Sequence, residues 1–265
     1  MSKRSIKDVD VAGKTVLVRV DFNVPTRGGV ISDDSRIRAA LPTIKLLREG
    51  GAKVVVCSHF GRPKGQIVEE MRLTAVRERL AELLDTDVAN ASGPSGTTPS
   101  EVVSTLKSGE VALLETLRFE LGEEANDAEF SKHLAGLADI YVNDAFGAAH
   151  RAHASTAGVA AHLPAYAGLL MERELEMLGS SLEGSTGAPV AIVGGAKVAD
   201  KIQVLLHLAT KVDTILVGGG MVAAFYVAQG MSGGAAEVTE EDTDAAKRLL
   251  SSSGANVVLP ADVVT

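Results

Sequence analysis

The chain is poor in cysteine and has no long apolar run. Its one cysteine, Cys57, cannot form an intrachain disulfide. No run approaches the roughly 18 apolar residues that a membrane helix needs. No apolar core follows the first five residues, so no signal peptide is evident. These absences predict a protein of a reducing compartment, the cytoplasm, with no membrane partner.

Basic charge is also scarce. The 265 residues include 26 Lys and Arg against 34 Asp and Glu, a net charge of −8, which argues against nonspecific nucleic-acid binding. No nucleophile-elbow, HExxH or CxxC motif is present, so hydrolase and metalloprotease functions have no support. In contrast, 46% of the residues are hydrophobic, which is enough for a core and excludes a disordered chain. The length suits one large or two modest domains.

Short apolar runs that are typical of strands alternate with segments of helical periodicity. The expected strands are 15–20, 53–58, 111–115, 140–143, 189–193, 214–217 and 257–259. The expected helices are 42–49, 74–84, 126–137, 197–209, 221–228 and 240–251. Most of the strands are apolar throughout, as in sheets that are buried on both faces. The alternation predicts an α/β fold with a parallel sheet covered by helices.

Local signals mark the beginnings of three of these helices. Pro42 is expected in the first turn of its helix, where a missing N–H group costs nothing. Asn126 with Glu129, and Thr239 with Asp242, resemble capping boxes. We therefore expect Asn126 and Thr239 to cap the helices that follow them.

The sequence predicts two domains. Residues 1–168 form the first, and an amphipathic helix at 169–183 joins it to a second domain at 184–265, which begins in a turn-rich stretch. The stretch 92–100, rich in Ser, Gly, Pro and Thr, is too short for a domain linker and is expected to be a local loop. The last apolar run has no closing helix, and an exposed apolar strand favours aggregation. We therefore expect the second domain to be incomplete and the chain to be a fragment.

Charged side chains follow four expected strands of the first domain. Ligands of open α/β sheets bind beyond the carboxyl ends of the strands, so these are candidate binding residues. In strand order they are Asp21, Asn23 and Arg36, then His59 and Arg62, then Arg118, then Arg151. Guanidinium groups suit carboxylate and phosphate oxygens, and four of them together would repel one another without an anion. The pattern predicts a small, multiply negative ligand.

Each of these residues also has a structural interpretation. A single arginine is usually a solvated charge or half of a surface salt bridge, and a lone histidine is more often structural than a ligand. Asp21 and Asn23 would also suit a strand end and a turn. His150 and His153 invite a metal interpretation, but no cysteine or carboxylate cluster completes a zinc site. The joint placement at four strand ends favours binding.

Two glycine turns follow strands of the second domain. Glycines let a ligand approach the backbone, and a helix N-terminus attracts anions, so the turns predict a phosphate site for a nucleotide. The residues concerned are Gly194, Gly195, Lys197, Lys201, Gly218 and Gly219. The first turn is expected to open the helix that carries both lysines. The spacing is not that of a P-loop, and either turn alone would suit a tight connection.

A weaker signal indicates a different enzyme class. Gly218, Gly220 and Ala223 have the spacing of a dinucleotide fingerprint, and Glu237 lies about where the ribose-binding acid would be. That acid should end a second strand, but the residues around Glu237 are typical of a loop before a helix. A dinucleotide-dependent oxidoreductase is therefore one alternative, and a non-catalytic anion-binding fragment is another.

Five motifs resemble those of the phosphoglycerate kinase family and occur in the same order. They are VRVDFNVP at 18–25, DDSRI at 33–37, SHFGRPKG at 58–65, YVNDAFGAAHRAH at 141–153 and IVGGAKVADK at 192–201. The likeness extends from Val16 to about Met221, and five long motifs in order are highly specific. The resemblance implies two Rossmann-like, three-layer α/β/α domains with parallel sheets, joined by a hinge helix.

The resemblance further implies reversible phosphoryl transfer from 1,3-bisphosphoglycerate to ADP, giving 3-phosphoglycerate and ATP, in a monomer that uses Mg²⁺ with the nucleotide. The family's phosphoglycerate contacts fall on Asp21, Asn23, Arg36, His59, Arg62, Arg118 and Arg151. Its nucleotide contacts fall on Gly194, Gly195, Lys197, Lys201, Gly218 and Gly219. Arg36 and Lys197 are the residues that it assigns to catalysis.

Two departures from the family pattern stand out. Thr116 occupies a position where the family usually has asparagine, which removes an amide from the third strand end. The family also continues well past Thr265. Its acidic residue at the magnesium nucleotide, a late glycine-rich turn and the closing segment are therefore expected outside this sequence.

Overall fold

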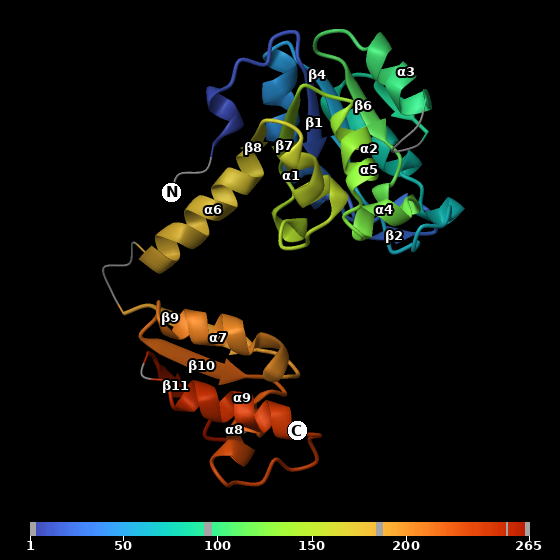
Figure 1. The fold of residues 1–265 in the computed structure, drawn as a ribbon. Coiled ribbons are helices and arrows are strands. Elements are labelled where there is room, and N and C mark those ends of the chain that lie inside the picture. The colour runs from blue at the N-terminus through green and yellow to red at the C-terminus, as the bar shows by residue number, and fades with distance from the viewer. Residues whose placement is uncertain (1–3, 93–96, 184–187, 253, 263–265) are drawn as a thin grey trace. The chain divides into compact units, whose positions relative to one another are not determined.

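A computed structural model describes residues 4–92, 97–183, 188–252 and 254–262 of the chain. The chain forms two compact units, Met1–Leu175 and Glu176–Thr265 (Figure 1). The division falls inside helix α6 (Leu169–Glu183). None of the described helices combines the length and the apolar character needed to cross a membrane.

Unit 1 is built on a six-stranded sheet in the order β5-β6-β4-β1-β7-β8. Its strands are β1 (Thr15–Arg19), β4 (Lys53–Cys57), β5 (Val88–Ala91), β6 (Val111–Leu114), β7 (Ile140–Asn143) and β8 (Ala165–Ala167). Every pairing in it is parallel. The strands predicted at 15–20, 53–58, 111–115 and 140–143 are confirmed to within one residue at each end, whereas β5 and β8 were missed.

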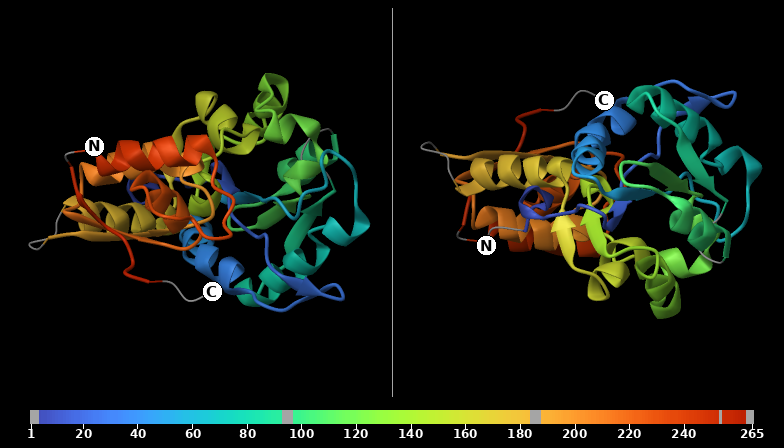
Figure 2. Two further views of the ribbon diagram at one scale, coloured as in Figure 1. Left: turned by 90° about the horizontal axis from the view of Figure 1, so that it is seen from below. Right: turned by 90° about the horizontal axis from the view of Figure 1, so that it is seen from above.

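Helices cover both faces of this sheet. One face packs with α1 (Ser35–Glu49) and α2 (Thr74–Leu84) around Val16 and Val54. The other packs with α3 (Thr97–Thr105) and α5 (Ala128–Ala135) around Leu17 and Val55. Figure 2 shows the two helix pairs on opposite sides of the sheet. Burial on both faces explains why these strands are apolar throughout.

Shorter elements complete unit 1. They are the two-stranded antiparallel hairpin of β2 (Thr26–Arg27) and β3 (Val30–Ile31), helix α4 (Leu121–Glu124), the turns η1 (Ile6–Asp8), η2 (Glu69–Met71), η3 (Leu117–Phe119), η4 (Phe146–Ala148) and η6 (Val159–Ala161), and the π-helical turn η5 (Ala154–Gly158). The loop predicted at 92–100 is wrong for residues 97–100, which begin α3, while 93–96 lie outside the described residues.

Two predicted helix beginnings in unit 1 are wrong. Helix α1 begins at Ser35, so Pro42 lies inside it. Asp33 Oδ1 accepts the Ser35 N–H at 2.8 Å, which satisfies a donor of the first turn well before Pro42. In α5, Asp127 is the cap and accepts the N–H of Phe130 at 2.8 Å. The residue before this cap has a left-handed backbone, with φ of 52° at Asn126.

Unit 2 has a three-stranded parallel sheet in the order β11-β10-β9. Its strands are β9 (Val190–Gly194), β10 (Thr214–Gly218) and β11 (Asn256–Val258), each within one residue of its prediction. Its helical elements are η7 (Ala199–Lys201), α7 (Ile202–Ala209), α8 (Val222–Ala228) and α9 (Glu240–Leu250), which share one core with the sheet. Strand β9 alternates in burial, and Ile192 is 81% exposed. The final run at 263–265 lies outside the described residues.

The Thr239 cap of α9 is confirmed, because its hydroxyl accepts the Asp242 N–H at 3.1 Å. The beginning of α6 is capped across the chain. Asp144, which follows β7, accepts the N–H of Leu170 at 2.9 Å and of Met171 at 3.3 Å through Oδ1. Burial raises the pKa of the Asp144 carboxyl.

The packing around Asp144 predicts opposite outcomes for two alanine substitutions near α6. A Cβ at Gly168 would overlap Asp144 Oδ1 and lie 2.8 Å from its Cβ, whereas a Cβ at Gly179 would meet nothing within 4 Å. We expect Gly168→Ala to lower the free energy of unfolding by about 1–3 kcal/mol. Gly179→Ala should raise it by about 0.5–1 kcal/mol. Urea unfolding followed by circular dichroism tests both, and equal effects would contradict the packing.

Candidate functional site

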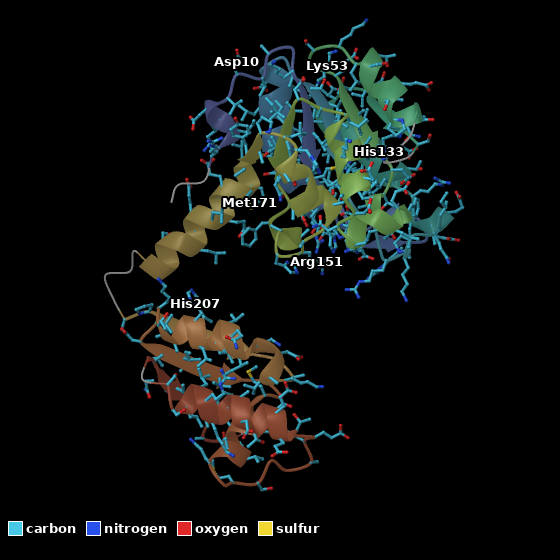
Figure 3. All side chains as sticks on the ribbon, viewed as in Figure 1. Asp10, Lys53, His133, Arg151, Met171 and His207 are labelled. Carbon is cyan, nitrogen blue, oxygen red and sulfur yellow. The ribbon has the colours of Figure 1, made fainter. Side chains whose placement is uncertain are left out.

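The four strands whose ends carry the predicted ligand-binding residues are neighbours in the sheet, in the order β6-β4-β1-β7. They are parallel, so the segments that follow them leave from one edge. Figure 3 shows Lys53, the first residue of β4, and Arg151, which follows β7, at opposite ends of the unit. The candidate site therefore lies at the carboxyl edge of the sheet in unit 1.

The segment after β1 brings three predicted residues together. Arg36, in the first turn of α1, lies with its Nη1 atom 2.9 Å from Asp21 Oδ2. Asn23 Oδ1 accepts the N–H of Gly61, which follows β4, at 3.0 Å. A Cβ at Gly147, after β7, would lie 3.5 Å from Asp21 Oδ2. Three strand ends thus meet around Asp21 and Asn23.

Gly61 also connects this group to Arg118. Arg118, in η3, is almost fully buried, and its Nη1 donates to the carbonyl oxygen of Gly61 at 2.8 Å. Its Nε lies 3.2 Å from Glu124 Oε1. Burial lowers the pKa of Arg118, with the charges of neighbouring groups as smaller causes. Arg62 is exposed beside Gly61 and has no hydrogen bond or ion pair with the described residues.

His59 lies where the arginines converge. The residue is only 4% exposed. Burial, followed by the positive charges of Arg19, Arg118 and Arg151, lowers the pKa of His59 to about 2. The imidazole is therefore neutral at physiological pH. The charges that act on His59 thus come from residues at three strand ends, and two of the predicted arginines, Arg118 and Arg151, are among them.

Thr116 keeps the third strand end bonded to the second. Its side chain is fully buried, and Oγ1 accepts the N–H of Phe60 at 2.6 Å. The backbone N–H of the next residue, Leu117, donates to the carbonyl oxygen of Ser58 at 3.0 Å. The hydroxyl therefore supplies a connection between the β6 and β4 ends at the position where an amide was expected.

Sequence reasoning missed three polar residues beneath His59. They are Arg19 at the end of β1, Glu123 in α4 and Ser155 in η5, which are all almost fully buried. The available signal was Arg19 itself, because an arginine inside an otherwise apolar strand needs buried partners. Its partners lie far away in the sequence and carried no signal of their own.

The lowered pKa of His59 predicts a pH-dependent stability. The unfolded chain binds a proton at His59 below about pH 6.5, whereas the folded chain does not until about pH 2. The stabilisation is therefore complete above pH 6.5 and falls by about 1.4 kcal/mol per pH unit as the pH drops below it. We expect His59→Gln to remove this slope in urea unfolding. The exposed His133→Gln variant is the control and should keep it.

The two glycine turns of unit 2 lie side by side. Gly194 and Gly218 are register partners at the ends of β9 and β10. A Cβ at Gly219 would lie 3.1 Å from the nitrogen of Gly195, and φ of Gly219 is +69°. A Cβ at Gly195 would lie 3.0 Å from Nζ of Lys201. The structure thus brings together these four glycines and one of the two lysines.

The predicted helix N-terminus behind the first turn differs from the structure. A 3₁₀ turn, η7, precedes α7, and Lys197 lies before it, so the turn does not open the helix directly. Asp242 of α9 accepts the N–H groups of Val198 and Ala199, each at 3.1 Å. The Asp242 carboxylate therefore occupies the N–H groups of Val198 and Ala199, which were expected to bind a phosphate. The side chain of Lys197 is exposed.

A pocket of about 670 Å³ adjoins the second glycine turn. Its lining is made of small and apolar residues, namely Gly219, Gly220, Val222, Ala223, Tyr226, Ser232, Gly233, Gly234, Ala235 and Ala236. Of the predicted nucleotide residues, only Gly219 is among them. A concave, mostly apolar wall with exposed backbone groups suits a flat aromatic base.

A sequence model of the phosphoglycerate kinase family matches residues 6–265. The chain belongs to the phosphoglycerate kinase family. Its fold is similar to that of phosphoglycerate kinase from Coxiella burnetii, with a TM-score of 0.83 and 38% identity over 98% of this chain. It is also similar to phosphoglycerate kinase from Pyrococcus horikoshii, with a TM-score of 0.74 and 36% identity over 86% of this chain. The chain spans 66% and 58% of the lengths of these two structures.

Membership of the phosphoglycerate kinase family removes the oxidoreductase alternative. Glu237 lies in the loop before α9 and not at the end of a strand, so the dinucleotide fingerprint lacks its acid. The zinc interpretation of His150 and His153 gains no support, because the described residues include no group of three or more His, Cys, Asp or Glu side chains placed to hold a metal ion.

Proposed function

We propose that this chain acts in the reaction of a phosphoglycerate kinase, the reversible transfer of a phosphoryl group from 1,3-bisphosphoglycerate to ADP, which gives 3-phosphoglycerate and ATP. The enzyme class is a phosphotransferase with a carboxyl group as acceptor. The observation that carries the proposal is the convergence of arginines from several strand ends on His59 in a chain with a net charge of −8. Such a cluster suits a small polyanion.

In the proposed reaction, unit 1 binds the phosphoglycerate. Arg62, Arg118 and Arg151 hold the 3-phosphate by charge, and His59 adds a hydrogen bond as a neutral imidazole. Arg36 lies near the carboxyl group and the moving phosphoryl group, held in place by its 2.9 Å ion pair with Asp21. The arginines remain charged at any working pH, so binding needs no proton exchange with solvent.

Unit 2 binds the nucleotide in this proposal. The pocket beside Gly219 receives the base, and the paired glycine turns with Lys201 receive the phosphates. Lys197 stabilises the charge of the phosphoryl group during transfer. The attacking oxygen of 3-phosphoglycerate or ADP is already ionised, so the reaction needs positioning and charge stabilisation and no general base.

Magnesium is proposed to enter with the phosphates of ADP or ATP, whose charge it neutralises. The described residues offer no cluster of three metal-ligating side chains of their own, so no step is assigned here to a protein-held ion. In-line transfer requires both ligands in one place, and the proposed reaction therefore requires units 1 and 2 to bring their ligands together during turnover. We further propose that the protein is a cytoplasmic monomer.

The exposed Arg62 offers a direct test of the phosphoglycerate site. Its side chain is exposed and makes no hydrogen bond or ion pair with the described residues, so Arg62→Ala should leave the fold intact and remove one charge-assisted contact to the ligand. We expect the affinity for 3-phosphoglycerate to fall by about 1.5–3 kcal/mol in isothermal titration calorimetry. The exposed Arg27→Ala, in β2, is the matched control and should bind normally. Unchanged affinity for Arg62→Ala would remove this residue from the site.

The activity itself is tested by a coupled assay. The chain is mixed with 3-phosphoglycerate, ATP and magnesium, and formation of 1,3-bisphosphoglycerate is followed through a reductive coupling enzyme. The proposal predicts turnover that depends on both substrates. Binding of 3-phosphoglycerate without turnover would instead favour a non-catalytic anion-binding fragment, and absence of both would reject the proposed function.

A further inference from the structure

A continuous chain of buried hydrogen bonds begins at Glu123. This carboxylate is 0% exposed and accepts two hydrogen bonds from one residue. The hydroxyl of Ser155 donates to Glu123 Oε1 at 2.6 Å, and the backbone N–H of Ser155 donates to Oε2 at 3.0 Å. Because the hydroxyl proton is used toward Glu123, the Ser155 oxygen is left as an acceptor on its other side.

Arg19 occupies that other side. Its Nε donates to Ser155 Oγ at 2.9 Å, and its Nη1 donates to the carbonyl oxygen of Val20. The guanidinium is 1% exposed and lies in the last position of β1. Glu123 therefore supplies a buried negative charge to a buried positive charge through one serine hydroxyl. The arrangement fixes the plane of the guanidinium, because two of its nitrogens are held by fixed acceptors.

The third nitrogen of Arg19 fixes the proton on His59. Nη2 of Arg19 lies 3.1 Å from Nδ1 of His59. A guanidinium can only donate, so Nδ1 must carry the lone pair, and the single proton of a neutral imidazole must lie on Nε2. Nε2 makes no hydrogen bond to the described residues and is free to donate to a ligand.

The charged groups around the ring act in the same direction. Arg19, Arg118, Arg151 and His153 all disfavour a second proton on His59. Glu123 Oε1 lies 3.7 Å from Nδ1 of His153, so its charge faces that second histidine as well. Glu124 faces Arg118 at 3.2 Å. The carboxylates thus contact His153 and Arg118, whereas Arg19 is the one charged side chain among the described residues that lies within hydrogen-bond distance of the His59 ring.

We propose that Glu123 and Ser155 are positioning residues, which hold Arg19 so that it fixes His59 as the tautomer protonated at Nε2. Unit 1 then presents His59 to the ligand as a neutral, directed hydrogen-bond donor among charged guanidinium groups. This assignment deepens the proposed function, because the ligand that receives the bond is the phosphoglycerate. The tautomer itself is a property of the free chain and can be tested without any ligand.

The tautomer is measured by long-range proton–nitrogen correlation spectra of the full chain labelled with ¹⁵N-histidine. His59→Gln identifies the His59 signals. We expect an unprotonated, pyridine-like Nδ1 and a protonated Nε2 throughout the neutral pH range. A protonated Nδ1, or a ring that is doubly protonated near pH 7, would overturn the proposal, whatever the outcome of the activity assay.

A pair of serine variants then tests the positioning role. Ser155→Ala removes the hydroxyl between Glu123 and Arg19, whereas Ser131→Ala removes an equally buried hydroxyl that donates to the carbonyl oxygen of Asp127 at 2.6 Å. We expect Ser155→Ala to give mixed His59 tautomers and an about tenfold weaker binding of 3-phosphoglycerate. Ser131→Ala should keep the wild-type tautomer and affinity. If Ser155→Ala and Ser131→Ala have the same stability, His59 tautomer and affinity for 3-phosphoglycerate, Ser155 does not position Arg19 and the proposal is wrong.

A conservative change at Glu123, where the chain of hydrogen bonds begins, keeps the test independent of folding. Glu123→Gln retains one oxygen that accepts from the Ser155 hydroxyl, but it removes the charge and places an amide NH2 where Oε2 accepted the backbone N–H of Ser155. It should keep the Nε2 tautomer, because the bond from Arg19 to His59 survives. A loss of the tautomer in Glu123→Gln with normal folding would show that charge, and not the chain of hydrogen bonds, selects it, and would overturn the proposed route through Ser155.

Discussion

Replacing Glu123 with alanine is expected to lower the free energy of unfolding by about 3–5 kcal/mol. The change leaves the backbone N–H and the hydroxyl of Ser155 without their acceptor, and it removes the negative charge nearest to the buried Arg19 along the hydrogen-bond chain. A buried cation without a partner cannot recover its hydration while the fold persists. Urea unfolding of the full chain, followed by circular dichroism, measures the loss.

Glu124 provides the matched control for this prediction. It is the next residue in α4, and its carboxylate makes an ion pair with Arg118, but its side chain is 45% exposed. The exposed carboxylate is already solvated, and Arg118 loses its ion pair but keeps its hydrogen bond to the carbonyl oxygen of Gly61, so Glu124→Ala should cost about 1–2 kcal/mol, less than Glu123→Ala. Similar losses for the two variants would mean that Glu123 is solvated in solution and that the buried network does not exist as described.

The contrast between Glu123 and Arg118 shows how far the sequence could predict the site. Arg118, Arg151 and His59 follow apolar strand runs, and the rule that parallel strands end at one edge is enough to bring them together. Glu123 lies in a four-residue helix, and its partner Ser155 is remote in the sequence. Hydrophobic period and spacing carry no information about such a pairing, which only the packed fold creates.

The helix boundaries show a similar limit in the fold. Strands β1, β4, β6 and β7 were predictable because burial on both faces makes them mostly apolar. The sequence predicts Pro42 in a first turn because proline is common there, but α1 begins at Ser35, whose N–H donates to Asp33. A local side-chain hydrogen bond therefore decided the boundary. The short hairpin of β2 and β3 has too few residues for any period to be detected.

Lys197→Ala is expected to lower kcat by about 10²–10³-fold in the coupled assay, the effect of removing one group that stabilises transition-state charge. The residue follows the glycine turn after β9. Its side chain is exposed and makes no hydrogen bond or ion pair with the described residues. Because Lys197 belongs to unit 2 and 3-phosphoglycerate is proposed to bind unit 1, the affinity for 3-phosphoglycerate should not change. A fall in kcat without a change in that affinity identifies an interaction made in the transition state.

Lys211 is the control for Lys197. It is also exposed, but it precedes β10 and so lies toward the amino end of the same sheet, away from the glycine turns. Lys211→Ala should keep the wild-type kcat and the wild-type thermal stability. If Lys197→Ala retains near-normal kcat, or if both variants lose activity equally, Lys197 has no specific role in transfer.

Side chains from separate strand ends of unit 1 are proposed to form one site for a small polyanion. A titration of the ¹⁵N-labelled chain with 3-phosphoglycerate, followed by backbone amide spectra, tests it most directly. We expect saturable shifts at Asn23, Gly61 and Arg151, with little change at Thr15 and Lys53 at the amino ends of β1 and β4. No saturable shift, or shifts confined to the amino ends of the strands, would contradict it.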